Sequence, residues 1–208
     1  MEERKLTEKE SLEVITSMIA RTKQRYIGDG RIMLMWGYLV VAVAVLVWAM
    51  IAFTGQVIWN VLWFVIPIVG GIATPLMARR EQHEKGARTY SDIVTARLWT
   101  FAGISEFVMM LVCFCVQLFT GAHCWTAMLA YTLIAMSFTE IAWGLFVKEN
   151  SFIAGSLAGL AAGIVTVCCI AGDIPLYANW YMPVFILAFV AMNIVPGHIL
   201  NHKAKENR

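Results

Sequence analysis

Charged side chains are scarce in this sequence: Asp, Glu, Lys and Arg make up only 14% of its 208 residues. Soluble domains carry about 25% charged residues, so a water-soluble globular fold is excluded. The sequence also lacks HExxH, GxSxG, a Walker loop, a dinucleotide-binding fingerprint and any tandem acidic motif. These motifs supply metal, nucleophile or phosphate sites to enzymes. Their absence disfavours an enzyme without excluding one.

Cysteines paired by spacing within loops are also missing, which argues against a disulfide framework. The five cysteines lie in or beside apolar runs, toward the ends expected to be outside: Cys113, Cys115, Cys124, Cys168 and Cys169. With His123 nearby they could suit Cu(I) or redox chemistry, but there is no CxxC motif. A disulfide that involves Cys124 stays open on an oxidising face. We expect these cysteines mainly to pack in helix interfaces, and we expect neither a metal nor a cofactor.

Long apolar runs are abundant, since 60% of the residues are hydrophobic. A transmembrane helix needs about 20 such residues. Six runs qualify: 33–54, 57–77, 98–119, 123–147, 151–171 and 179–200. The sequence predicts an all-α polytopic membrane protein with six transmembrane helices. Its expected parts are a cytoplasmic segment at 1–31, a transmembrane domain at 32–200 and a cytoplasmic tail at 201–208.

The basic residues predict the orientation. All 16 Lys and Arg residues precede the first run, lie between the second and third or the fourth and fifth, or follow the sixth. Such residues favour the cytoplasmic side, so both termini are expected there, in a bacterial inner membrane. Because topology explains the basic residues, we expect no nucleic-acid partner.

An internal repeat is indicated by residues that recur at fixed offsets. The matches at an offset of 66 are Gly37, Phe53, Thr54, Gly55 and Trp59 with Gly103, Phe119, Thr120, Gly121 and Trp125. Trp59 and Pro75 match Trp180 and Pro196 at an offset of 121. These matches favour three helical hairpins that run in the same direction, although short loops and interfacial tryptophans also produce matches by chance.

The segment at 7–27 is typical of an amphipathic helix. Thr7 and Glu10 have the spacing of a capping box, and Leu12, Ile15 and Ile19 recur at near-helical intervals. The helix could lie on anionic lipid headgroups, or it could bind a cytoplasmic protein or a second subunit.

Three polar residues fall inside the expected spans. Glu106 lies about 12 Å, and Glu140 and Asn193 each about 10 Å, from the inner ends of their runs at 1.5 Å per residue. Buried charge is costly in a membrane, so this common level predicts a polar cavity open to the cytoplasm. Two adjacent carboxylates there would share a proton and could bind a cation or move a proton. The alternative is hydrogen bonding between helices.

Helix breakers and small residues add further candidates. Pro67 and Pro196 could be hinges, and His198, near the inner end of the last run, could be a gate or an interfacial residue. The stripe of Gly155, Gly159 and Gly163 predicts close helix packing, within the chain or across a homo-oligomer.

The segments LTEKESLEVITSMI at 6–19 and NIVPGHILN at 193–201 resemble the ends of small six-span bacterial membrane proteins of unknown function. The resemblance implies an inner-membrane location and no catalytic residue. The residues favour a small transporter-like or ligand- and ion-binding bundle in the lipid bilayer. The alternative is a scaffold or regulatory partner that acts through the N-terminal helix.

Overall fold

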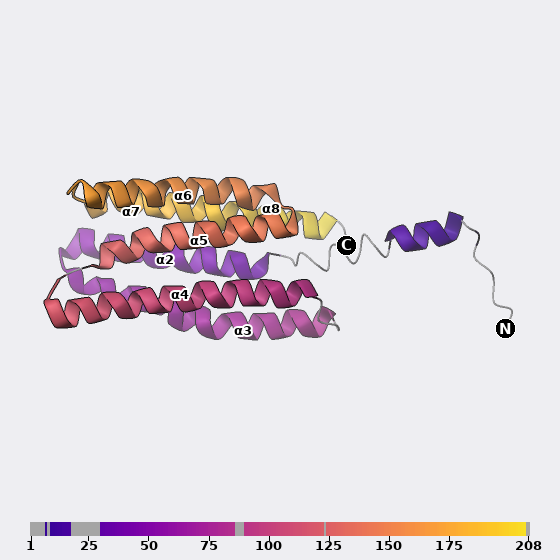
Figure 1. The fold of residues 1–208 in the computed structure, drawn as a ribbon, viewed down its shortest axis with the longest axis horizontal. Helices are drawn as coiled ribbons and strands as arrows, with labels where there is room; N and C mark the ends of the chain where they lie inside the picture. Colours follow the sequence, from indigo (N-terminus) through magenta and orange to yellow (C-terminus); the bar gives the residue numbers. More distant parts are fainter. Residues whose placement is uncertain (1–6, 8, 18–29, 86–89, 123, 207–208) are drawn as a thin grey trace.

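The structure is a computed structural model that describes residues 7, 9–17, 30–85, 90–122 and 124–206. These residues form helices and no strands. A short N-terminal helix covers residues 9–17, and a bundle of antiparallel helices follows (Figure 1). The predicted segments 18–29 and position 123, which include Ile19 and His123, lie outside the described residues.

The bundle makes six passes. The first two are α2 (Arg31–Thr54) and the pair η1 (Val57–Phe64) and α3 (Val65–Lys85). The next three are α4 (Tyr90–Thr120), α5 (Trp125–Val147) and α6 (Asn150–Ala171). The last consists of α7 (Ala178–Phe189), the π-helical turn η2 (Val190–Ile194) and α8 (Val195–Glu206). Among the described residues, six helical stretches are long and apolar enough to cross a membrane, which confirms the number of expected spans.

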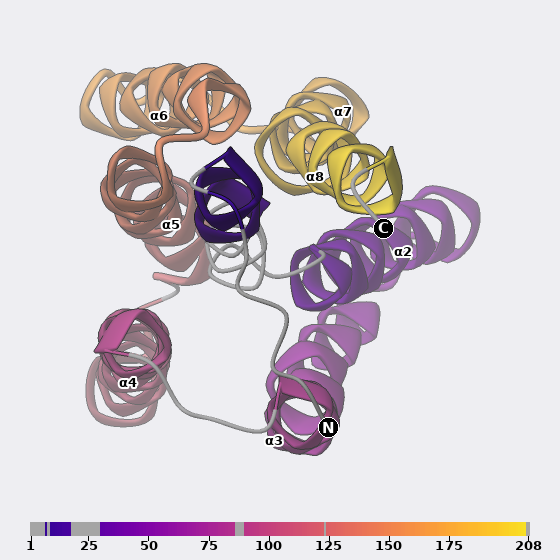
Figure 2. The same cartoon turned by 90° about the vertical axis from the view of Figure 1, so that its right-hand side faces the viewer.

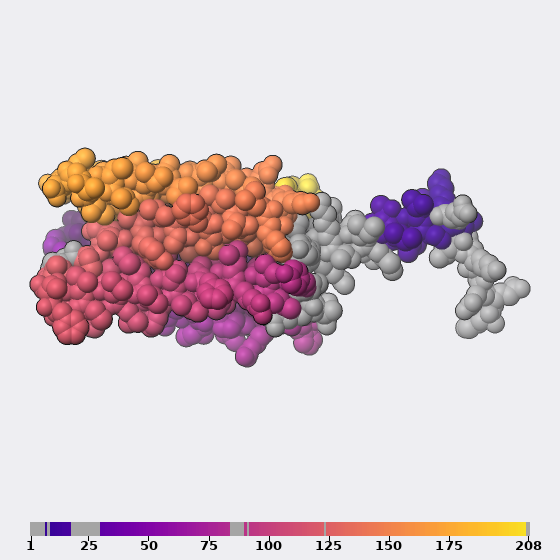
Figure 3. All heavy atoms as spheres, in the orientation of Figure 1, coloured from indigo at the N-terminus to yellow at the C-terminus, as the bar shows by residue number. Residues whose placement is uncertain are grey.

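The hydrophobic core lies between α2, α5 and α7, where Val40, Leu133, Phe185 and Met192 of the adjoining η2 pack together. The passes form a ring when the bundle is viewed along its length, with α3 held by α2 and α4 held by α5 (Figure 2). Only 6% of the α3 span and 11% of the α4 span are buried, against 44% of the last span. The side chains of α3 and α4 are therefore largely exposed, and in Figure 3 α4 runs along the bundle below α5 and α6.

Helices α2 and α4 end in the same way. The hydroxyls of Thr54 and Thr120 each donate to the carbonyl oxygen four residues earlier, at 2.6 Å in both cases. The following residues, Gly55 and Gly121, have φ values of 66° and 70°, a left-handed conformation that glycine adopts without a steric penalty. Each glycine N–H caps its helix by bonding the carbonyl four residues back. The matched Thr-Gly pairs are thus equivalent helix stops.

Two boundaries differ from the sequence expectation. The second span opens with the 3₁₀ helix η1 and becomes α-helical at Val65. The third span, expected from 98, begins at Tyr90. Its first turns are too polar for a hydropathy count, although they continue the same helix. Glu106 therefore lies 16 residues from the start of α4, about 24 Å along the helix, and not eight residues as the expected run implied.

The predicted capping box is present at the start of the N-terminal helix. The Glu10 carboxylate accepts a hydrogen bond from the Thr7 N–H at 2.8 Å, and the Glu10 N–H donates to Thr7 Oγ1 at 3.3 Å. Donation from the Thr7 backbone, and then from its hydroxyl, holds the pKa of the Glu10 carboxyl below its usual value of 4.5.

We expect Thr7→Ala to destabilise the first turn of this helix, because the Glu10 N–H loses its acceptor, Thr7 Oγ1, and the Glu10 carboxylate loses the hydroxyl donor at 2.9 Å, while the bond from the backbone N–H of residue 7 remains. The pKa of Glu10 is lowered in the folded state, so the contribution of its carboxylate to the stability of the helix is complete at pH values above 4.5, the usual pKa of Glu. It is lost as the pH falls through the lowered pKa. Backbone Cα chemical shifts of Ser11 and Leu12 in the full chain measure the effect. Helical shifts unchanged by Thr7→Ala, or by acidification through this range, would show that the box is not needed.

Candidate functional site: a buried carboxylate beside a helix break

Glu140 is a completely buried acid within α5, with an exposed fraction of 0%. Helices α5 and α6 pack against each other along their length, which places Ser156 of α6 opposite it. The Ser156 hydroxyl donates to Glu140 Oε2 at 2.8 Å. One oxygen of the carboxyl is therefore satisfied by a neutral donor.

Asn193 reaches the same place from η2. It is a polar neighbour of the Glu140 carboxyl and is 2% exposed. Neither Glu140 Oε1 nor Asn193 Nδ2 has a partner in hydrogen-bonding geometry among the described residues. Buried polar groups are normally paired; here the Asn193 amide, a donor, adjoins the Glu140 carboxyl, an acceptor, so the two form a loosely made polar pair inside the bundle.

The backbone around Asn193 is broken as well. The Val195 N–H bonds to Val190 rather than to Ala191, which is the wider π-helical pattern. The next residue, Pro196, has no N–H. The Ala191 carbonyl therefore lacks both donors that could reach it within its own helix. In membrane proteins such freed carbonyls are tolerated where they are buried against protein or face a cavity.

Gly155 of α6 lies directly against this freed carbonyl. A Cβ atom at Gly155 would lie 2.1 Å from the Ala191 oxygen, so only glycine permits the approach. The other two glycines of the stripe also face inward: Gly159 lies against Met192 and Ser137, and Gly163 against α5. The stripe thus packs α6 against η2 and α5 within the chain.

Glu106 lies elsewhere in the bundle. Its Oε2 accepts a hydrogen bond from the Thr132 hydroxyl of α5 at 2.8 Å, and its Oε1 is buried without a partner. Thr132 and Glu140 are eight positions apart on α5, about 12 Å along the axis. The structure brings Glu140 and Asn193 together but not Glu106, since α4 extends past the start of α5 and shifts the register between them.

The remaining sequence candidates are two prolines and a histidine, which lie in different parts of the bundle. Pro196 is buried and follows η2, whereas Pro67 is exposed in the first turn of α3, where its missing N–H is tolerated. His198 is exposed and makes a 2.7 Å hydrogen bond with Tyr38 of α2. It therefore joins α8 to α2 and does not point at Glu140.

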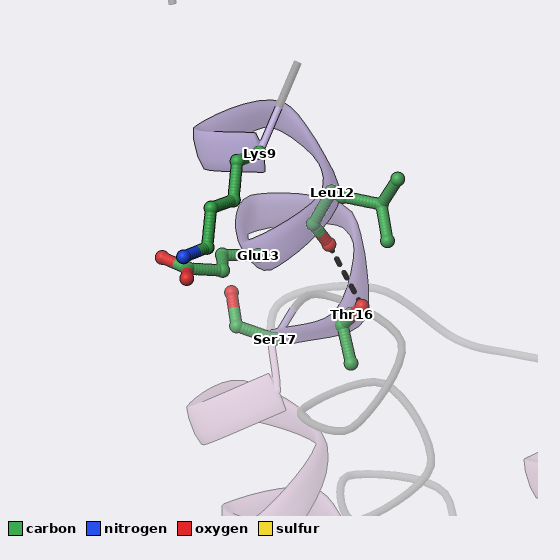
Figure 4. Close-up of a pocket in the computed structure, with 5 residues that line it drawn as sticks. All are labelled: Lys9, Leu12, Glu13, Thr16 and Ser17. Atoms are coloured by element: carbon green, nitrogen blue, oxygen red, sulfur yellow. Dashed lines mark hydrogen bonds between the residues drawn. The ribbon is translucent and has the colours of Figure 1, made fainter. Parts of the chain in front are cut away.

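Two hollows on the surface of the described residues lie away from the Glu140 cluster. One lies on the exposed side of the N-terminal helix alone, between Lys9, Leu12, Glu13, Thr16 and Ser17 (Figure 4). The other lies at the end of the bundle where α5 begins and α6 ends. Among the described residues, no group of three or more His, Cys, Asp or Glu side chains is placed to hold a metal ion.

Sequence reasoning missed Ser156 and Thr132, the two hydroxyl donors to the carboxyls. Both are ordinary small residues in apolar helices, and only their position opposite an acid distinguishes them. It also missed η2, although Pro196-Gly197 following Asn193 gives a local indication of a helix break. Scans of known protein families, curated proteins and solved structures find no match for this chain.

Proposed function

We propose that this chain is a small ion-binding, transporter-like membrane protein whose site is formed by Glu140, Ser156 and Asn193. The observation that carries the proposal is the fully buried Glu140 carboxyl, which has the Ser156 hydroxyl as a donor to one oxygen and only the loosely placed Asn193 amide as a further polar neighbour. Ionisable groups inside membrane bundles are costly and commonly serve ion or proton pathways.

The freed Ala191 carbonyl supports a cation or a proton as the ligand. In many transporters the carbonyls of interrupted helices coordinate Na⁺ or H⁺ at the site. Here a carboxylate, an amide and a helix break meet within one buried cluster. A carboxylate with neutral oxygen donors suits a hard cation, and the same carboxyl can instead carry a proton.

Access of an ion from the cytoplasm to Glu140 would require a movement of the helices, because the Glu140 side chain is fully buried in the described conformation. Glu140 is seven residues from the end of α5 at Val147, about 10 Å along the helix. We propose that α8 swings about η2 and Pro196 to expose it. Glu106 would then be a second, separate carboxyl farther along the bundle.

We infer that both termini face the cytoplasm in a bacterial inner membrane. The support is the distribution of the 16 basic residues, which all fall before, between or after the expected spans on one side. The equivalent Thr-Gly stops of α2 and α4 support the proposed hairpin repeat. The resemblance to small six-span bacterial proteins stays a prediction.

The proposal is tested by ion uptake into liposomes that contain the purified protein, with protons and Na⁺ as separate probes. We expect Glu140→Gln to lower uptake at least tenfold, since it removes the charge but keeps the size and the Ser156 bond. Glu106→Gln should have a smaller effect. The control Glu13→Gln, on the exposed N-terminal helix, should leave uptake unchanged. Equal uptake by wild type and Glu140→Gln would overturn the proposal.

A scaffold or regulatory partner is the second candidate function. Its support is the capped N-terminal helix, on which Leu12 and Ile15 are 68% and 55% exposed. These side chains suit a lipid surface, a cytoplasmic protein or a second copy of the chain. Absence of uptake by the wild-type protein for both probes would favour this function.

A further inference from the structure

Cys113 and Cys124 are paired across the α4–α5 turn. The Cys113 thiol donates to the Cys124 carbonyl at 3.6 Å, and the Cys124 thiol donates to the Cys113 carbonyl at 3.6 Å. The two thiols are also direct neighbours of each other. Each sulfur thus lies against the backbone of the other residue, in an arrangement unlike that of the remaining three cysteines.

The local fold explains this pairing. Helix α4 continues past the level at which α5 begins and stops at Gly121 with a φ of 70°. The chain then returns, so that Cys124, which caps α5, lies beside a residue two turns back in α4. Trp125 Nε1 donates to Gln117 Oε1 across the same turn, which holds the two helices in this register.

The two thiols differ in access. Cys113 is fully buried, but Cys124 lines the hollow that opens at this end of the bundle beside Ala127, Ile170 and Asp173. A reagent can therefore reach the Cys124 thiol first, because the Cys113 thiol is buried. This division of roles is the one that a stepwise thiol–disulfide exchange requires.

We propose that Cys113 and Cys124 form an intramolecular disulfide when a dithiol–disulfide oxidant acts on Cys124. The Cys124 thiolate attacks the oxidant's disulfide, which breaks as a mixed disulfide forms. Cys113 then attacks the Cys124 sulfur and releases the oxidant as a dithiol. The two cysteines lose two electrons to the oxidant and two protons to its sulfurs. The bond ties α4 to α5.

Oxidation in the cell rests on the proposed orientation, in which this end of the bundle faces the oxidising side. The geometry of the pair does not depend on that orientation. Two measurements therefore test the geometry of the pair and the orientation of the chain separately. Oxidation of the purified chain tests the pair, and trapping in intact cells tests its exposure to an oxidant.

The first measurement treats the purified full chain in detergent with oxidised glutathione and then blocks the remaining thiols with N-ethylmaleimide. We expect the labels per chain to fall from the full set of five cysteines by two. Mass spectrometry should show a peptide pair linked through Cys113 and Cys124. Cys113→Ser should abolish this linkage, and Cys168→Ser should leave it unchanged.

Continued labelling of both Cys113 and Cys124 after oxidation would overturn the proposal, as would a linkage between chains in place of one within the chain. If Cys113→Ser fails to fold, Cys124→Ser, at the more exposed position, gives the same readout. In intact cells, rapid alkylation should find the pair already linked in a strain with its disulfide oxidant and reduced in a strain without it. A pair reduced in both strains, with in vitro oxidation intact, would overturn the orientation and leave the geometry of the pair standing.

Discussion

Glu140→Ala is expected to lower the free energy of unfolding by about 3–5 kcal/mol. The substitution removes most of a fully buried side chain, and large-to-small changes at such sites cost about 2–5 kcal/mol. It also leaves the Ser156 hydroxyl without its acceptor, and an unsatisfied buried donor costs about 1–3 kcal/mol. For a chain of this size the midpoint of thermal unfolding should fall by about 6–20 °C. Tryptophan fluorescence in detergent measures this midpoint.

Glu140→Gln is the matched control for that substitution. Glutamine keeps the volume and an oxygen that can accept the Ser156 hydrogen bond, so the midpoint should change by less than about 3 °C. The pair separates structural from functional roles, because the proposed function predicts that Gln abolishes uptake without unfolding the chain. Equal midpoints for the Ala and Gln variants would contradict the packing role of Glu140.

Gly155→Ala is expected to lower the free energy of unfolding by about 3 kcal/mol. The added Cβ would lie 2.1 Å from the Ala191 carbonyl oxygen and 3.0 Å from its carbon. These are backbone atoms, so relief requires α6 and η2 to separate along their contact. Overpacking of this kind costs about 1–3 kcal/mol and at times more, which lowers the unfolding midpoint by about 6–12 °C.

Gly103→Ala is the matched control, since a Cβ at Gly103 in α4 would meet nothing within 4 Å. Alanine is favoured over glycine in a helix by about 1 kcal/mol, so the midpoint should stay the same or rise slightly. Gly155→Ala with an unchanged midpoint would show that α6 and η2 are not packed as described. A fall of similar size in both variants would point to a general effect of losing glycine.

Gly155 and the Glu140 carboxyl are connected through adjacent residues of α6, so a change at one should affect the other. Gly155 holds α6 against the freed carbonyl of η2, and the neighbouring Ser156 holds the Glu140 carboxyl. A movement of α8 about η2 would therefore disturb the carboxyl and its donor together. Gly155→Ala should consequently reduce uptake at temperatures below its unfolding midpoint, through displacement of η2 from the site.

The local features were predictable because they depend on neighbours in the sequence. The apolar runs predicted six helices of spanning length, since their hydropathy alone sets that outcome. Thr7 and Glu10 predicted a capping box that the structure contains, because its bonds join residues three positions apart. The depth of Glu140 relative to the end of α5 was also predictable, since the predicted and observed ends coincide at 147.

The sequence by itself determined the number of long apolar helices, their approximate positions and the presence of an acid within α5. Only the tertiary structure decided that Glu140 meets Ser156 and Asn193 while Glu106 pairs with Thr132. Hydropathy places the ends of each helix separately. The register between helices comes from side-chain packing and from close approaches such as that of Gly155 to Ala191, which no single helix encodes.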